Sequence, residues 1–509
     1  MTTLRRQMAF GAAWMMAVRL VDRGIGLVST VVLARVLVPA DFGVVAMAMG
    51  VVALLELFAA FGLDAALIQQ REVDRAHYDT AWTFNVGLGL AVSAGLLVLA
   101  WPAAIFYKQP PLAWVLVVLA AAPLIQGLEN IGLVAFRRDL NFRADFLINT
   151  CKRLILFVIT VSLAFVLRSY WALVLGIVAG RTLGVLLSYV VHPYRPRFSL
   201  AARYQLFGFS KWVLSTNTAT FALQRCSDVI IGRVLGPRAL GLFNVGAELA
   251  SLPSSELVAP INRALFPGFS KIAGDRHALR REYFTFIGFV SMIGLPAAIG
   301  VASIAHLIVP LVLGPNWVDA IVIVKIVAIA GTLQLLQTTN YAVYLAVGRP
   351  SRQLVVLCVQ LAVLIPSMTY LSSVAGINGA AYAFAFAAAV SLPVTLSMVL
   401  RELQAHVIDF VRAIWRPVVG TSAMYFSIQY LSPPNAPLTT PQLLVRLVEV
   451  VALGALSYSA VVVACWFVAG RPDATEATIL QQLMEIRERA FQMARGIMAN
   501  GRAGIQRRD

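Results

Sequence analysis

The segment Ala34-Arg-Val-Leu-Val-Pro-Ala-Asp-Phe-Gly43 has a counterpart later in the chain, Gly232-Arg-Val-Leu-Gly-Pro-Arg-Ala-Leu-Gly241. Five of the ten positions are identical at an offset of 198 residues: the arginine, valine and leucine near the start, the proline, and the closing glycine. Each segment lies between two long apolar stretches, so each predicts a tight turn between consecutive membrane spans. The repeat therefore predicts two equivalent six-span halves, related by an axis along the membrane normal.

The composition around these turns is that of a membrane protein. Of the 509 residues, 60% are hydrophobic and 13% are charged, against about 25% charged residues in soluble domains. Apolar runs of about 20 residues, long enough to cross a bilayer as helices, recur along the chain. The sequence predicts an all-α, polytopic helical membrane protein with about 14 transmembrane helices, in two six-helix lobes plus two extra C-terminal helices. One span is expected over 113–136, and Ala375–Gly376 is expected to connect two others.

The repeat and the changes in composition divide the chain into five parts. They are an N-lobe over 1–191, a cytoplasmic amphipathic linker over 192–211, a C-lobe over 212–400, the extra spans over 401–469, and an amphipathic basic tail over 470–509.

The net charge of +17 follows the expected topology. Most of the 41 lysines and arginines lie in or beside connections on one side, which predicts that both termini are cytoplasmic. Anionic membrane lipids are the expected partners of this charge, and nucleic acid is not. The expected location is the bacterial cytoplasmic (inner) membrane.

Charged residues inside spans are the main functional signal, because each is costly unless it faces water or a partner. In the first span, Arg19 and Arg23 share a helix face, and Asp22 could neutralise one of them. Two readings stay open for this cluster: a self-satisfied knot between helices, or a cavity-facing anion site. The seventh span carries a similar polar stripe, formed by Asn217, Thr220, Gln224 and Asp228, with Arg225 three residues before Asp228.

Since the first and seventh spans hold equivalent places in the repeat, we expect both clusters to face one central cavity. Guanidinium groups there would suit a phosphate or pyrophosphate, which arginine binds in a bidentate manner. The weaker substrate-binding candidates are Arg263, Gln334 and Gln337, for which a lipid headgroup or interhelical hydrogen bonds are the alternatives. Three further acids, Glu56, Glu129 and Glu248, could pair with the arginines or take part in ion coupling, together with Asp22 and Asp228.

No nucleophile, metal-binding or nucleotide-binding motif occurs in the chain, and no predicted outer loop has room for a catalytic domain. We therefore predict a transporter and not an enzyme, with no catalytic residue, metal or cofactor. The choice between proton and sodium coupling stays open.

Four short stretches together resemble bacterial polysaccharide flippases of the multidrug/oligosaccharidyl-lipid/polysaccharide exporter superfamily. They are Leu33–Met47, Ala65–Gln69, Asp228–Gly236 and Leu265–Pro267. The resemblance is strongest to the lipopolysaccharide and exopolysaccharide, colanic-acid-like branch. It implies translocation of undecaprenyl-pyrophosphate-linked oligosaccharide repeat units by alternating access. It also implies a cationic cavity lined by Arg19, Arg23 and Arg225, and partners such as a polysaccharide polymerase and the export machinery.

Three alternatives remain. A multidrug-type exporter of the same superfamily would favour acids and aromatics in its cavity. A membrane enzyme, such as a polysaccharide polymerase, would need a large outer loop or an outer carboxylate. A non-transporting membrane scaffold of the same fold would not need the arginines.

Overall fold

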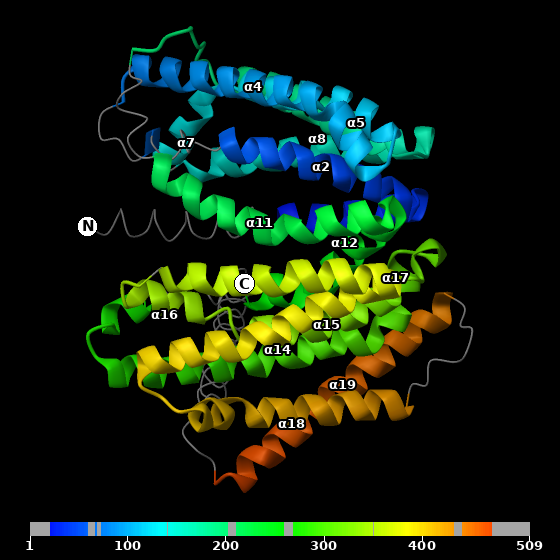
Figure 1. Cartoon of the computed structure of the whole chain (residues 1–509), viewed down its shortest axis with the longest axis vertical. Helices are drawn as coiled ribbons and strands as arrows, with labels where there is room; N and C mark the ends of the chain where they lie inside the picture. Colours follow the sequence, from blue (N-terminus) through cyan, green and yellow to red (C-terminus); the bar gives the residue numbers. More distant parts are fainter. Residues whose placement is uncertain are drawn as a thin grey trace, which may run out of the picture. The chain divides into compact units, whose positions relative to one another are not determined.

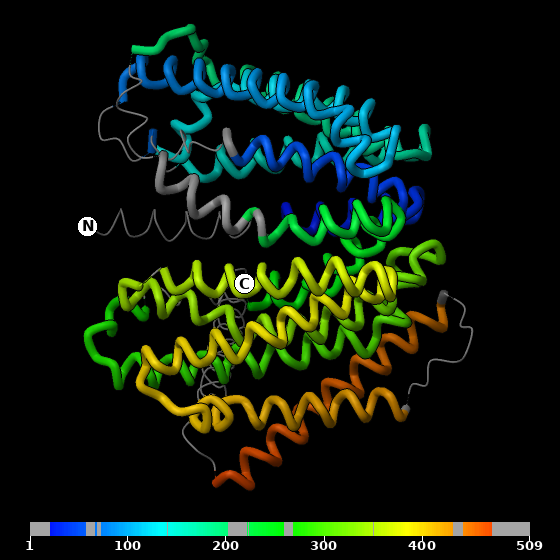
Figure 2. Tube along the Cα trace, viewed as in Figure 1, coloured from blue at the N-terminus to red at the C-terminus, as the bar shows by residue number. Residues whose placement is uncertain are grey.

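The computed structural model describes residues 21–59, 67–68, 73–139, 141–201, 210–258, 268–349, 351–431 and 440–470. These residues form helices joined by short connections and contain no strand (Figure 1). Figure 2 follows the same path along the Cα trace. The all-helical fold class is confirmed.

Eight helices in the described part of the chain are long and apolar enough to cross a membrane, or nine if a bent pair counts as one span. They are Pro39–Leu57, Arg75–Tyr107, Phe142–Leu167, Trp171–Val191, Arg276–Val312, Ala320–Ala346, Ser351–Leu403 and Pro441–Val468. The expected total of 14 is consistent with this set, although that number stays a prediction. The chain is thus a multi-pass membrane protein.

Helix α17 (Ser351–Leu403) contains the expected short connection. Its backbone leaves the helical region at Ala375 and at Gly376, whose φ is 59°. A positive φ is readily available to glycine and costly for other residues, so Gly376 can divide the 53-residue helix into two spans.

The chain forms two compact units, each described here by itself. The first comprises Met1–Leu249, Ala305–Val327 and Leu354–Val390, and the second comprises Ala250–Ile304, Ala328–Gln353 and Ser391–Asp509. These groupings leave the five-part division of the chain as a prediction.

In the first unit, the two repeated turns pack against each other. Helix α2 (Pro39–Ala59) begins after the first turn, and α12 (Pro237–Leu252) follows α11 (Ser210–Leu235) after the second. A Cβ on Gly43 would lie 1.7 Å from the carbonyl oxygen of Pro237, and a Cβ on Gly241 would lie 1.8 Å from that of Pro39. Only glycine permits such close backbone contact. We call residues 34–43 and 232–241 the turn seam; the exchange of equivalent contacts across it supports the internal repeat.

Each turn also contacts the end of a long helix from the other half of the sequence. Arg35 Nε donates a hydrogen bond to the Val312 carbonyl oxygen at 3.3 Å, where α14 (Arg276–Val312) ends. In the second copy, Arg233 lies 5.7 Å from the ring centre of Phe106, near the end of α4 (Arg75–Tyr107). The seam therefore joins both halves within one unit.

The expected span over 113–136 is broken, which corrects the expectation of one continuous helix. Helices α5 (Pro111–Leu119) and α6 (Ala121–Gly127) are followed by the short η1 (Ile131–Leu133) and α7 (Val134–Arg138), and the two parts meet at 57°. Asn130 holds the break, because its side chain accepts a hydrogen bond from Gly132 N and donates to the carbonyl oxygens of His192 and Tyr194. The physical reason for the break is this polar cap, which replaces lost helical hydrogen bonds.

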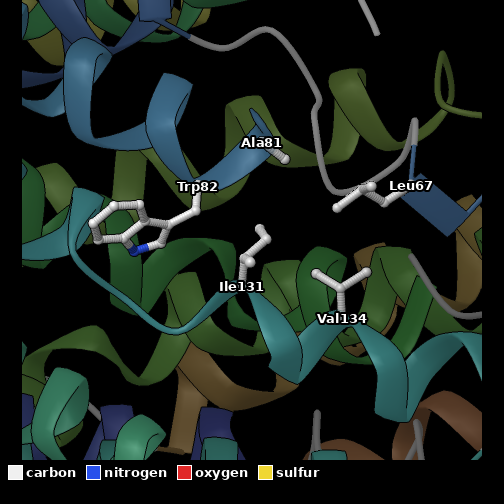
Figure 3. Packing of buried hydrophobic residues seen from close by; sticks show 5 residues of the cluster. All are labelled: Leu67, Ala81, Trp82, Ile131 and Val134. Atoms are coloured by element: carbon white, nitrogen blue, oxygen red, sulfur yellow. The ribbon is translucent and has the colours of Figure 1, made fainter. Parts of the chain in front are cut away.

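The described first part of the linker lies along the start of α4. Arg197 N donates to Asp79 Oδ1 at 2.8 Å, and the Trp82 and Phe198 rings are 5.0 Å apart. A cluster of buried apolar side chains brings together α4, the broken span and Leu67 (Figure 3); its members are Leu67, Ala81, Trp82, Ile131 and Val134. This packing holds the start of α4 against the broken span.

The second unit contains the two extra helices, α18 (Val407–Leu431) and α19 (Thr440–Val468), which pack on each other. Tyr458 donates a hydrogen bond to the Met292 carbonyl oxygen at 2.7 Å, and Arg280 and Asp409 form an ion pair at 2.6 Å. Both contacts attach the extra helices to α14.

Candidate functional site

A cavity of about 1160 Å³ lies within the N-terminal half of the chain. Its walls come from residues 21–36, the broken span, α2, α4, α8 (Phe142–Leu167) and α9 (Trp171–Val191). We call it the N-half cavity. All of its lining residues belong to the first compact unit.

The charged residues that line this cavity form ion pairs between different elements. The pairs are Arg153–Asp22 at 3.1 Å, Arg181–Glu56 at 3.4 Å, Arg137–Asp145 at 2.9 Å, and Lys152–Glu129. Because each cation has a carboxylate partner, four positive and four negative groups can be present in one apolar bundle.

Small residues on α9 bring α8 close enough to place these charges. A Cβ on Gly176 would lie 2.3 Å from Thr160 Oγ1, and a Cβ on Gly180 would lie 2.6 Å from Leu156 Cδ1. Gly184 follows at the same spacing, opposite the stem of Lys152. Glycines four residues apart form one helix face on which a neighbouring helix can pack closely. This face sets the position of Lys152 in the cavity wall.

The first span contributes a second pair of charges beside the cavity. Arg23 and Glu248 of α12 form an ion pair at 3.8 Å, with side chains 35% and 36% exposed. Arg153 lies over Gly26, whose Cβ would be 3.2 Å from its Nη2. We call Asp22, Arg23, Arg153 and Glu248 the first-span charge network. A guanidinium has five N–H donors in a planar fork, so one arginine can contact a carboxylate and a further anion at the same time.

The ion partners found in this network come from other helices. The sequence suggested that Asp22 could neutralise Arg19 or Arg23; in the structure Asp22 forms an ion pair with Arg153 of α8, and Arg23 forms one with Glu248 of α12. Because Arg19 lies outside the described residues, its pairing with Asp22 stays a prediction.

The seventh-span residues lie on α11. Arg225 and Asp228 form an ion pair at 3.0 Å, three residues apart, and Gln224 is exposed. In the second unit, Gln337 accepts hydrogen bonds from Ser391 at 3.3 Å and Thr395 at 3.2 Å. Gln334 is exposed there.

Three candidates lie outside the described residues: Arg19, Arg263 and the side chain of Asn217. A single cavity shared by all of the predicted binding residues therefore stays a prediction. Among the predicted acids, Asp22, Glu56 and Glu129 line the N-half cavity.

Sequence reasoning missed four cations of the cavity: Arg137, Lys152, Arg153 and Arg181. The first three were assigned to membrane topology, and the last had no evident partner. One signal was present for Arg181, because Glu56 is an equally isolated charge of opposite sign inside another span.

Metal-binding side chains are not clustered in the described segments. Within them, no group of three or more His, Cys, Asp or Glu side chains could hold a metal ion. The chemistry available in the N-half cavity is therefore that of ion pairs, amides and hydroxyls.

Comparison with known proteins gives two kinds of similarity. The model of a family described as "Polysaccharide biosynthesis protein" matches residues 32–322. The chain is 28% identical over 342 residues to the lipopolysaccharide biosynthesis protein WzxC of Escherichia coli (strain K12), covering 65% of this chain and 68% of that protein. It is 27% identical over 310 residues to the succinoglycan biosynthesis transport protein ExoT of Rhizobium meliloti (strain 1021), covering 60% and 63%.

Solved structures share the fold. The lipid II flippase MurJ in an inward closed conformation matches with a TM-score of 0.69 and 12% identity, over 90% of this chain and 99% of that one. An inward-facing multidrug resistance transporter of the MATE family matches with a TM-score of 0.54 and 14% identity, over 75% and 96%. At these identities the likeness concerns the fold alone.

Proposed function

Because the chain belongs to the polysaccharide biosynthesis protein family, we propose that it flips lipid-linked oligosaccharide repeat units across the bacterial cytoplasmic membrane. The matched residues, 32–322, include both turns of the seam and nearly all of the N-half cavity wall. The relatives are named for lipopolysaccharide biosynthesis and succinoglycan transport, which supports a lipid-linked glycan as the substrate. Transport, and not catalysis, is the activity we assign.

The first-span charge network is the observation that carries this proposal. Arg23 and Arg153 each face a carboxylate, and their side chains remain 35% and 41% exposed. A pyrophosphate can replace those carboxylates, because its oxygens accept bidentate hydrogen bonds from guanidinium groups. Such exchange lets the network hold an anionic substrate and stay neutralised when empty.

The fold supports alternating access as the transport mechanism. MATE transporters and MurJ share it, so the fold does not choose between drug export and lipid flipping. The family membership and the arginines do favour the lipid-linked glycan, because an organic cation would be repelled by exposed guanidinium groups.

The test is polysaccharide export in a strain that lacks the protein, complemented with Arg23→Ala or, separately, Arg225→Ala. We expect each variant to lower export by about 10- to 100-fold, because hydrogen bonds to charged groups contribute about 1.5–3 kcal/mol. Lipid-linked precursor should accumulate on the cytoplasmic side.

Arg446→Ala is the matched control, since this arginine pairs with Glu449 on its own helix, α19, and belongs to neither cluster. It should retain export, and immunoblots should show equal membrane levels for all variants. Normal export from both cavity variants would reject a role for these arginines. An unchanged glycan in the deletion strain would reject the proposed function itself.

A further inference from the structure

We propose that the N-half cavity is a sugar-binding subsite. It takes the uncharged, hydroxyl-rich part of the substrate while the first-span charge network takes the pyrophosphate. This inference rests on the proposed function and adds where the glycan lies. Asp22 and Arg153 belong to both the cavity lining and the charge network, so the two subsites are continuous.

The charge balance of the cavity points to a neutral ligand. Its four cations are each paired with one of its four carboxylates, so the lining as a whole attracts neither anions nor cations strongly. Paired carboxylates and guanidinium groups still have unused acceptor and donor positions. Sugar hydroxyls, which both donate and accept hydrogen bonds, can use those positions without separating the ion pairs.

One amide in the wall is available for such a ligand. Asn85 of α4 lines the cavity at the break in the fourth span, where a Cβ on Gly127 would lie 2.5 Å from its carbonyl oxygen. Three other lining amides are bonded within the protein: Asn149 donates to the Asp145 carbonyl oxygen at 2.8 Å, Gln126 donates to the Glu129 carboxylate, and Asn130 caps η1. Among the described residues, Asn85 has no hydrogen-bond partner for its side chain. A discontinuous span beside an available polar group is typical of transporter binding sites.

The volume suits a glycan. Pockets for drug-sized ligands occupy about 300–1,000 Å³, and the N-half cavity has about 1160 Å³. It therefore has room for more than one sugar ring.

The polar lining is not a requirement of the fold. Residues 143–191, which form the fifth and sixth spans, contain six charged residues. The counterpart helix in the second half, α17 (Ser351–Leu403), contains three, and all of them lie at its two ends. A half can thus adopt this helical arrangement without charges in the middle of its spans, so Lys152, Arg153 and Arg181 in the first half point to a ligand.

Gly184 offers a direct test, because it lines the cavity and its position tolerates a Cβ. A Cβ there would make ordinary contact with Lys152 Cγ at 3.6 Å. Gly184→Ala should fit, whereas Gly184→Leu should project into the cavity and reduce its volume. Asn85→Leu is an independent variant that removes the free amide without changing α9.

The assay uses the full-length protein in proteoliposomes with two substrates on undecaprenyl pyrophosphate, one carrying the complete repeat unit and one carrying a single sugar. Arrival in the opposite leaflet is measured with an externally added lectin. We expect Gly184→Leu to slow the complete unit at least 10-fold more than the single sugar, and Asn85→Leu to slow it several-fold more. Gly87→Leu, at an exposed glycine of α4 that does not line the cavity, should behave as the wild type with both substrates.

Two results would overturn the subsite. One is transport of the complete unit at the wild-type rate by both Gly184→Leu and Asn85→Leu. The other is an equal loss for both substrates in both variants, which would make the cavity a packing feature. Failure of the wild-type protein to move either substrate would instead reject the proposed function.

Discussion

Replacing Gly43 by alanine should weaken the turn seam by a predictable amount. The new Cβ would lie 1.7 Å from the Pro237 carbonyl oxygen, whereas real Cβ atoms essentially never come within 3.0 Å of another heavy atom. The nearest atoms belong to the backbone, so the two turns must separate by about 1.3 Å. Overpacking of this kind costs about 1–3 kcal/mol, or more where the backbone itself must move.

Gly50→Ala, in the same helix, is the control that separates the cost of the clash from the other effects of alanine. Nothing lies within 4 Å of a Cβ at position 50. Both substitutions gain the helix propensity of alanine, about 0.8–1.0 kcal/mol, so the difference between the two variants reports the clash alone. The measurement is the thermal melting of the purified full-length protein in detergent, together with its export activity in cells.

We expect Gly43→Ala to melt below the wild type and Gly50→Ala to melt at or above it. Gly241→Ala should reproduce the loss, because its Cβ would lie 1.8 Å from the Pro39 carbonyl oxygen. Equal melting temperatures for Gly43→Ala and Gly50→Ala would refute the close packing of the two turns and, with it, the structural reading of the repeat.

Two further outcomes are expected elsewhere in the molecule. Glu56→Gln leaves Arg181 without its carboxylate and should destabilise the protein by about 1–2 kcal/mol, given the partial exposure of both groups. Adding Arg181→Met removes the unpaired charge and should restore the melting temperature. A double variant that shows no recovery would contradict the pairing. At the start of α18, the backbone N–H of His406 and the Arg280 guanidinium lower the pKa of Asp409 below its ordinary value of 3.8. A lowered pKa stabilises the folded state only where the carboxyl is ionised. Asp409→Asn should therefore lower the melting temperature at about pH 5–8, and its difference from the wild type should shrink below about pH 4. A melting-temperature difference that is constant across this pH range would argue against the ion pair.

The sequence was most informative where local chemistry alone determines the structure. Hydropathy predicted the helical membrane class, and Ala375–Gly376 was correctly expected as a connection because glycine tolerates the positive φ found there. The break in the fourth span was missed. It depends on Asn130 reaching the carbonyl oxygens of His192 and Tyr194, more than sixty residues away, and no local pattern reveals such a contact.

The site was harder to predict, because charges in a membrane are partnered across helices. The helical repeat correctly placed Asp228 beside Arg225, three residues earlier. It gave no indication of the ion pair between Asp22 and Arg153, because Arg153 lies on α8. The glycines at 176, 180 and 184 carry the missing information, since they determine which face of α9 meets α8. A pattern of small residues in one span could therefore have been used to ask which charges of the next span face inward.

The repeat and the cavity carry different information about this protein. Arg35, Pro39 and Gly43 recur as Arg233, Pro237 and Gly241, and these residues build the seam that joins the halves. The in-span charges do not recur: at the same offset, Asp22, Arg23 and Glu56 correspond to Thr220, Phe221 and Ser254. Packing at the seam requires glycine in both copies, because Gly43 and Gly241 each meet the backbone of the opposite turn. A substrate site needs no such symmetry, since the lipid-linked glycan has different chemistry at its two ends. The residues shared by the halves thus identify the scaffold, and those that differ between the halves identify where to look for the substrate.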